Sequence, residues 1–219
     1  RSGWWNLYRW RDGAVEALHP LAAEFGKPQW VFDMASYAFV DGTIVCSYSA
    51  KGRSHLALLN ATGQLEPLAL PWDQFYHVKA QGSTVLLLAA SASEPLALVL
   101  FDLASRASTV LRRGSALAID PGYLSLPQAV EFPTTGGQTA HAIFYPPQNR
   151  DFAAPAGELP PLLVESHGGP TGSVDGSLKP GIQYWTSRGI AVVDVNYGGS
   201  TGYGRAYRQR LNGQWGVVD

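Results

Sequence analysis

The chain has 219 residues, 46% of them hydrophobic and 15% charged, which is enough to bury a core and excludes an intrinsically disordered protein. A formal net charge of -1 gives no general attraction to nucleic acid or to an anionic membrane, and no apolar run is long enough to span a bilayer. The single cysteine, Cys46, excludes an internal disulfide framework and a multi-cysteine metal site, and its apolar neighbours predict a buried strand residue.

Short apolar runs alternate with turns through residues 1–125. Three similar turn segments each follow an apolar run, at residues 11–18, 61–68 and 103–111. A second pair agrees, because Asp41-Gly42 and Gln81-Gly82 each precede a strand-like run. A period of about 40–45 residues with several strands in each unit is typical of β-propeller blades.

A closed propeller needs at least about four blades of roughly 40 residues each. Residues 1–125 therefore predict a partial β-propeller of about two to three blades, which cannot close a ring. A β-sandwich with coincidental turns is the alternative for this part of the chain.

The pattern changes after Pro121. Residues 127–132 and 139–145 predict paired strands around Gly136-Gly137, and a loop rich in proline and alanine follows to residue 160. Next come a buried strand ending at Ser166, a helix near 177–188, a second buried strand at 190–196 and a last helix at about 203–212. These two buried strands, which alternate with helices, predict a parallel sheet of βαβ units.

Glycine-rich segments follow both buried strands. His167-Gly168-Gly169 comes directly after the first, and Tyr197 opens a similar segment after Asn196 ends the second. Ligands of such sheets bind at the carboxyl ends of the strands. A His-Gly-Gly segment in this position is typical of an oxyanion loop, whose backbone N–H groups face a carbonyl oxygen that becomes negative. His167, Gly168 and Gly169 are therefore the candidate site residues for acyl-transfer chemistry.

The segment from Gly198 to Gly202 satisfies the pattern G-x-S-x-G, with Ser200 in the nucleophile position. A hydrolase of this type places its acid and then its histidine after the serine. No histidine follows Ser200, and the only acidic residue after it is Asp219. We therefore interpret the segment as a glycine-rich loop that enters a helix, with Ser200 or Thr201 close to a cap.

Other polar residues are expected to have structural roles. His167 is expected to support its turn through hydrogen bonds rather than act as a general base, and Asp194, inside an apolar strand, needs a bonding partner. Glu24 and Glu94 lie in predicted turns and could reach the amino terminus of a peptide. No cluster has metal-ligand spacing, so no metal site is expected. The arginines of the last helix are expected to form a solvated face: Arg205, Arg208 and Arg210.

Several spaced motifs in residues 160–219 resemble the prolyl oligopeptidase family of serine peptidases, most of all its acylaminoacyl-peptidase and dipeptidyl-aminopeptidase branch. The motifs are His167-Gly168-Gly169-Pro170, residues 184–193, residues 195–204 and Gln214-Trp215-Gly216. The resemblance implies a β-propeller that caps an α/β-hydrolase domain and a Ser-Asp-His triad that hydrolyses short peptides or amino-acyl amides without a cofactor. It also implies that the N–H of Gly169 helps to hold the oxyanion. Gly198 departs from the family pattern, which commonly has arginine there.

In that family the nucleophile, the acid and the histidine come later than Asp219. The chain is therefore expected to be an internal segment, with a partial β-propeller at 1–125 and the N-terminal portion of an α/β-hydrolase domain at 126–219. It is expected to be inactive alone and to be completed by the remainder of the same polypeptide or by a second chain. The full-length protein is expected to be a serine-type exopeptidase or oligopeptidase, and the absence of a visible signal peptide favours a cytoplasmic location.

Two alternatives remain open. One is an esterase with a His-Gly-Gly oxyanion loop, against which Pro170 argues because that class usually continues with a third glycine. The other is a non-enzymatic propeller that serves as an interaction module on an inactive hydrolase scaffold.

Overall fold

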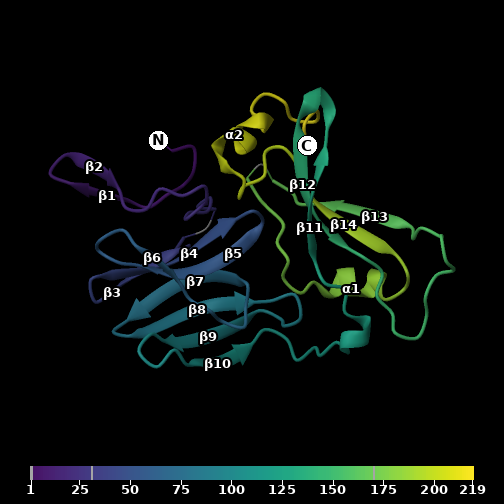
Figure 1. Ribbon diagram of the computed structural model, residues 1–219, viewed down its shortest axis with the longest axis horizontal. Helices are drawn as coiled ribbons and strands as arrows, with labels where there is room; N and C mark the ends of the chain where they lie inside the picture. Colours follow the sequence, from purple (N-terminus) through teal and green to yellow (C-terminus); the bar gives the residue numbers. More distant parts are fainter. Residues whose placement is uncertain (1, 31, 170) are drawn as a thin grey trace.

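The computed structural model describes residues 2–30, 32–169 and 171–219. Three antiparallel sheets form the first part of the chain, and a mixed sheet with short helices forms the second (Figure 1). Pro170, which entered the sequence arguments, lies outside the described residues. Among the described residues, no helix is long and apolar enough to cross a membrane.

The antiparallel sheets are a hairpin followed by two four-stranded meanders. The hairpin pairs β1 (Tyr8–Arg11) with β2 (Ala14–Ala17). The first meander has the order β3 (Tyr37–Val40), β4 (Thr43–Ala50), β5 (Arg53–Leu59) and β6 (Leu65–Pro67). The second has β7 (Gln74–Gln81), β8 (Thr84–Ala90), β9 (Ala97–Asp102) and β10 (Ser108–Arg113).

These meanders are propeller-like blades, as the repeat predicts. Asp41-Gly42 forms the turn between β3 and β4, and Gly82 lies at the equivalent turn between β7 and β8. Asp41 and Gly42 both have positive φ, 42° and 79°, which gives a two-residue loop whose twist suits an antiparallel hairpin. The repeated glycine-containing turns therefore join consecutive strands as antiparallel hairpins, which gives each blade its sequential strand order.

The main apolar core lies between the two blades. Val45 and Leu56 of the first blade and Val78, Val85 and Val99 of the second are almost completely buried in one cluster. Alternate strand residues face this core, which explains the alternating burial along β8 and β9. A smaller cluster beside it contains Cys46, and burial raises the pKa of this thiol to about 12, as expected of a structural cysteine.

The second part of the chain is a four-stranded sheet with the order β11-β12-β14-β13. Its strands are β11 (Gln128–Pro133), β12 (Thr139–Tyr145), β13 (Leu162–Ser166) and β14 (Ala191–Asn196). The helices are α1 (Pro180–Thr186) and α2 (Gly204–Arg208), with 3-10 turns at Pro121–Tyr123, Thr135–Gly137 and Gln209–Leu211. Both helices are shorter than the sequence predicts.

One βαβ unit, β13-α1-β14, is parallel as predicted. The pairs β11–β12 and β12–β14 are antiparallel, so the sheet as a whole is mixed, and the predicted pairing of residues 127–132 with 139–145 is confirmed. The prediction of a buried strand ending at Ser166 is wrong. Leu162 and Val164, which lie on the same face of β13, are 55% and 62% exposed, so the described residues leave this face of the strand largely uncovered. β13 is also the last strand of the sheet and pairs on one side alone among the described residues.

The two parts of the chain are joined by a buried ion pair. The carboxylate of Glu24 accepts a hydrogen bond from the backbone N–H of Trp5 at 2.6 Å and pairs with Arg208 of α2 at 3.1 Å. The guanidinium of Arg208 also stacks 3.9 Å from the ring centre of Trp5. The side chains of Glu24 and Arg208 are 1% and 13% exposed.

The arginines of α2 and its following turn therefore do not form a solvated face. Arg205 is exposed as predicted, but Arg208 is held between the N-terminal segment and α2. Arg210 donates a hydrogen bond to the backbone oxygen of Thr139 at 2.6 Å. The expectation fails because the N-terminal segment and β12 both pack against this short helical region, as Figure 1 shows for α2 and β12.

Replacing Arg208 by methionine should destabilise the protein strongly. The change keeps most of the side-chain volume but leaves the carboxylate of Glu24 buried without its cation, which costs about 3–5 kcal/mol. The matched change Arg205→Met, at an exposed position on the same helix, should stay within about 0.5 kcal/mol of wild type. Urea unfolding measures both, and equal losses for the two variants would contradict the role of the buried pair.

Candidate functional site

The loops that follow β13 and β14 meet at one edge of the mixed sheet. The two strands run parallel in the register Ser166 opposite Val195, so their carboxyl ends lie side by side. His167-Gly168-Gly169 follows β13, and the turn that begins at Tyr197 follows β14. The parallel pairing thus brings the two glycine-rich segments together, as the sequence predicts.

His167 is held by two residues of the second loop. Its Nε2 lies 2.7 Å from the hydroxyl oxygen of Ser200, and its ring stacks on the ring of Tyr197 with 4.4 Å between centres. Its Nδ1 lies 3.3 Å from the carbonyl oxygen of Gly168. Burial lowers the pKa of His167, so the ring is neutral at pH 7. These contacts agree with a histidine that supports its turn through hydrogen bonds.

Gly168 and Gly169 form the exposed side of the first loop. Gly169 has φ +77°, a conformation that favours glycine. Apart from the adjoining residues, no described residue has an atom within 4 Å of the position that a Cβ would take on Gly168 or Gly169. In the part of the chain that the structure describes, the N–H groups of Gly168 and Gly169 donate no hydrogen bond. Two backbone donors are therefore available to a ligand at the carboxyl end of β13.

Ser200 does not have the setting of a nucleophile. It is completely buried, its hydroxyl is engaged by His167, and its N–H donates to the backbone oxygen of Tyr197 at 3.0 Å. Among the described residues, no carboxylate bonds to His167. The pair of Ser200 and His167 therefore lacks both an orienting acid and access to solvent. Sequence analysis did not predict this contact, although both residues follow neighbouring parallel strands.

The remaining acidic candidates have different positions. Asp194 forms an ion pair with Lys179 at 2.7 Å, which is the structural bond expected of a buried carboxylate. Glu94 pairs with Arg113 at 2.9 Å on the exposed edge of the second blade. Glu24 lies at a cavity, but both of its carboxylate oxygens are already bonded.

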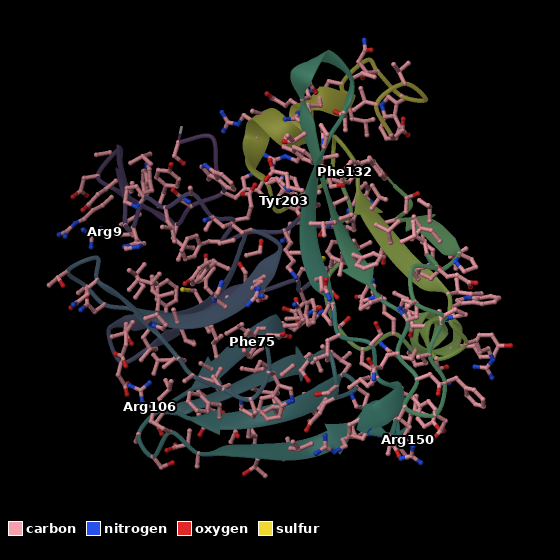
Figure 2. All side chains as sticks on the ribbon, turned by 45° about the vertical axis from the view of Figure 1, so that its right-hand side comes forward. Arg9, Phe75, Arg106, Phe132, Arg150 and Tyr203 are labelled. Atoms are coloured by element: carbon pink, nitrogen blue, oxygen red, sulfur yellow. The ribbon has the colours of Figure 1, made fainter. Side chains whose placement is uncertain are left out.

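That cavity, of about 310 Å³, lies between the blades and the loop that continues from the candidate oxyanion segment. Phe75 of the blades and Tyr203 of the mixed-sheet part line it, and Tyr48 and Tyr76 add further aromatic surface. Figure 2 labels Phe75 and Tyr203 on these two parts of the chain. Asp175 accepts hydrogen bonds from Tyr76 and from Ser177. Sequence analysis missed this cavity because its walls are far apart along the chain.

The ionisation of the cavity follows from these bonds. Burial alone would raise the pKa of Asp175, but the hydrogen bonds from Ser177 and Tyr76 outweigh it, and the pKa is lowered. Burial raises the pKa of Tyr76, so its hydroxyl stays protonated and donates to Asp175. The ammonium group of Lys27 lies 4.2 Å from the ring centre of Tyr76. Within the described ranges, no group of three His, Cys, Asp or Glu residues could hold a metal ion.

Comparison with known proteins adds to this geometry. The model of the prolyl oligopeptidase family, Peptidase_S9, matches residues 177–219. Dipeptidyl aminopeptidase BIII of Pseudoxanthomonas mexicana is 29% identical over 167 residues, which is 74% of this chain and 23% of that protein. Dipeptidyl peptidase family member 6 of Caenorhabditis elegans is 38% identical over 55 residues, which is 25% of this chain and 7% of that protein.

Solved structures cover nearly the whole chain. A puromycin-hydrolyzing peptidase of Mycobacterium tuberculosis is 41% identical with a TM-score of 0.94 over 99% of this chain and 34% of its own. A puromycin hydrolase is 40% identical with a TM-score of 0.91, over 99% of this chain and 33% of its own. An acylaminoacyl peptidase at 22% identity and a TM-score of 0.65 shares the fold. The chain thus spans about a third or less of the length of each of these relatives.

Gly199→Ala should destabilise the second loop. Gly199 has φ +123°, and a Cβ there would lie 2.7 Å from the Cβ of Leu211, so the change adds a backbone strain of about 1–3 kcal/mol to a steric clash. The matched change Gly181→Ala lies in α1 with open space around it and should be neutral or stabilising by up to about 1 kcal/mol. Urea unfolding distinguishes the two, and a neutral Gly199→Ala would contradict the packing.

The stability of the protein should fall as the pH drops below about 6.5. Burial lowers the pKa of His167 in the folded state, so the unfolded state binds a proton first as the pH falls. The contribution of His167 to the free energy of unfolding is therefore fully present above its unfolded-state pKa and is lost as the pH falls toward its folded-state pKa. Burial lowers the pKa values of His55 and His141 in the same direction, so His167→Gln should remove part of this pH dependence. Unfolding free energies measured between pH 7.5 and pH 5 by urea titration test this, and an unchanged slope in the variant would contradict it.

Proposed function

The chain belongs to the prolyl oligopeptidase family, and from this membership we propose that it forms part of a serine peptidase that hydrolyses short peptides or amino-acyl amides. The observation that carries the proposal is the exposed Gly168-Gly169 segment at the carboxyl end of β13, with two unused backbone donors. Backbone donors in this position suit the stabilisation of an oxyanion during acyl transfer.

We further propose that the two parts of the chain belong to two different domains. Residues 1–125 supply blades of a β-propeller, and residues 126–219 supply the N-terminal portion of an α/β-hydrolase domain. The order of strands supports this division, because an antiparallel β-hairpin, β11–β12, is followed by the parallel unit β13-α1-β14. The Ser-Asp-His triad would then lie beyond residue 219, in the remainder of the polypeptide or in a second chain that completes both domains.

The proposed chemistry gives Gly169 a defined role. The nucleophilic serine attacks the substrate carbonyl, and the carbonyl oxygen gains negative charge. The N–H of Gly169 and the N–H that follows the nucleophile donate hydrogen bonds to this oxygen. Loss of one such donor costs about 2.7–4 kcal/mol, or roughly 10²–10³ in kcat. The amide C–N bond then breaks, and the amine leaves with a proton as the acyl-enzyme forms. Water hydrolyses the acyl-enzyme, which releases the acid product and restores the serine hydroxyl.

The cavity supports a short substrate. It lies beside the segment that continues from Gly169, and its volume of about 310 Å³ is at the small end of the range for ligand sites, about 300–1,000 Å³. Its walls come from both parts of the chain, so a propeller in this position would restrict access by size. Two solved relatives are named for the hydrolysis of puromycin and one curated relative is named a dipeptidyl aminopeptidase, which favours amino-acyl substrates.

A fluorophosphonate probe and an amino-acyl nitroanilide test the proposal on the full-length protein. Wild type and Ser200→Ala should both be labelled stoichiometrically, and kcat of Ser200→Ala should stay within about tenfold of wild type, because the nucleophile lies elsewhere. Residues 1–219 alone should not be labelled. Loss of labelling in a folded Ser200→Ala variant would move the nucleophile to Ser200 and contradict the proposal.

Two substitutions at Gly169 both strain its backbone at positive φ, but only one of them removes the N–H donor. Gly169→Pro removes the N–H and should lower kcat roughly 10²–10³-fold, whereas Gly169→Ala keeps the N–H in open space and should lose much less. Circular dichroism must show that both variants fold, since proline cannot adopt φ +77°.

A second assay distinguishes a peptidase from an esterase. An amide and an ester of the same acid are assayed in parallel, and an esterase would hydrolyse the ester alone at a useful rate.

A further inference from the structure

We infer that Tyr197 is a positioning residue that holds the Gly168-Gly169 segment in the conformation needed to bind an oxyanion. The inference rests on the proposed function and adds to it a residue that does not itself contact the substrate. Tyr197 lies 28 residues from Gly169 along the chain and only 8% of its surface is exposed. The hydroxyl group of Tyr197 is the part of the side chain that holds the segment.

The first step is that the glycine segment needs an external support. Two consecutive glycines have wide conformational freedom, and ordering them carries a larger entropy cost than ordering other residues. Apart from the adjoining residues, no atom of the described residues lies within 4 Å of the Cβ positions of Gly168 and Gly169, so packing of the described residues on that side does not restrict them. The support must come from the opposite side of the loop, where the carbonyl groups of the segment are bonded.

Tyr197 supplies that support through two carbonyl oxygens. Its hydroxyl donates to the backbone oxygen of Gly169 at 2.8 Å and lies 3.2 Å from that of His167. Burial raises the pKa of Tyr197, with the charge of Asp219 acting in the same direction, so the hydroxyl keeps its proton and remains a donor. The carbonyl oxygens of His167 and Gly169 are thus anchored at one point.

The geometry of the peptide bond carries this effect to the donors. A carbonyl and the next N–H lie in one plane and point in opposite directions. Anchoring the oxygen of His167 therefore aims the N–H of Gly168 away from Tyr197. The peptide unit that carries the N–H of Gly169 lies between the two anchored carbonyls, and its own oxygen is 3.3 Å from the Nδ1 of His167.

His167 completes the support. Its ring stacks on the ring of Tyr197 at 4.4 Å and 21°, and the buried hydroxyl of Ser200 lies 2.7 Å from its Nε2. A second tie joins the same two loops, because the N–H of Thr201 donates to the backbone oxygen of Gly172 at 2.9 Å. Tyr197, His167 and Ser200 therefore act as one unit beneath the glycine segment, with the donors on its exposed side.

The test uses Tyr197→Phe in the full-length enzyme, with an amino-acyl nitroanilide as substrate and a peptide aldehyde as a transition-state analogue. The variant keeps the ring stack and loses the hydroxyl, so kcat should fall about 10–100-fold, because a donor that is misplaced by about 1 Å can cost that much. KM should change by less than about threefold, and the Ki of the aldehyde should rise about as much as kcat/KM falls. A purely structural role would not produce this correlated loss.

Tyr184→Phe is the matched control. Tyr184 lies exposed on α1, and its hydroxyl makes no hydrogen bond to the described residues of the glycine segment, so the variant should stay within about twofold of wild type in kcat and in Ki. If Tyr197→Phe does not fold, Ser200→Ala takes its place, since it frees the Nε2 of His167, and it should lower kcat about three- to tenfold with a matching rise in Ki.

The possible outcomes separate the positioning role of Tyr197 from the proposed peptidase activity. A folded Tyr197→Phe variant with unchanged kcat and Ki, in an active enzyme, overturns the positioning role and leaves the peptidase in place. A loss confined to KM also overturns it, because a misplaced oxyanion donor acts on the transition state. A wild-type protein that neither hydrolyses the nitroanilide nor reacts with a fluorophosphonate overturns both.

Discussion

The parallel pairing of β13 with β14 is the constraint on which the candidate site depends. In a parallel pair both carboxyl ends lie at one edge, so two loops that are about 30 residues apart along the chain come into contact there. A one-residue slip would turn each side chain of a strand to the other face. Asp194 would then lose Lys179, and the loop that begins at Tyr197 would start from the wrong face. The ion pair between Asp194 and Lys179 and the apolar residues of β14 therefore hold the register that aligns the loops.

Much of the fold follows from local signals in the sequence. Turns such as Asp41-Gly42 require positive φ, and they recur at a spacing that predicts the blades and the order of strands within each. The β11–β12 pair and the parallel β13–β14 unit also follow from short patterns. Their positions within the sheet do not, because pairing partners are chosen by contacts between distant residues. β12 is therefore antiparallel to β14, and β13 is exposed despite its apolar sequence.

The candidate site divides in the same way. Their position directly after an apolar strand, together with the need for backbone donors, is enough to single out His167, Gly168 and Gly169 as candidates. The cavity could not be predicted, because Tyr76 and Asp175, which bond to each other, are 99 residues apart. The roles of Glu24 and Arg208 were also hidden, since each reads as a surface residue until the N-terminal segment packs over α2.

Close packing around Gly198 explains why this position holds a residue without a side chain. The family commonly has arginine at this position, and any contact made by that arginine is absent here. A Cβ on Gly198 would lie 2.7 Å from the Cγ1 of Val218 and 3.3 Å from the Cδ of Arg210. The segment that follows α2 thus packs directly onto the turn, and a larger side chain at 198 would have to displace it. Arg210, which lies against this turn, uses its guanidinium to bond the backbone oxygen of Thr139 on β12. The loop beneath the glycine donors is therefore fixed from two sides, by Tyr197 toward β13 and by the close approach of residues 210–218 toward β12.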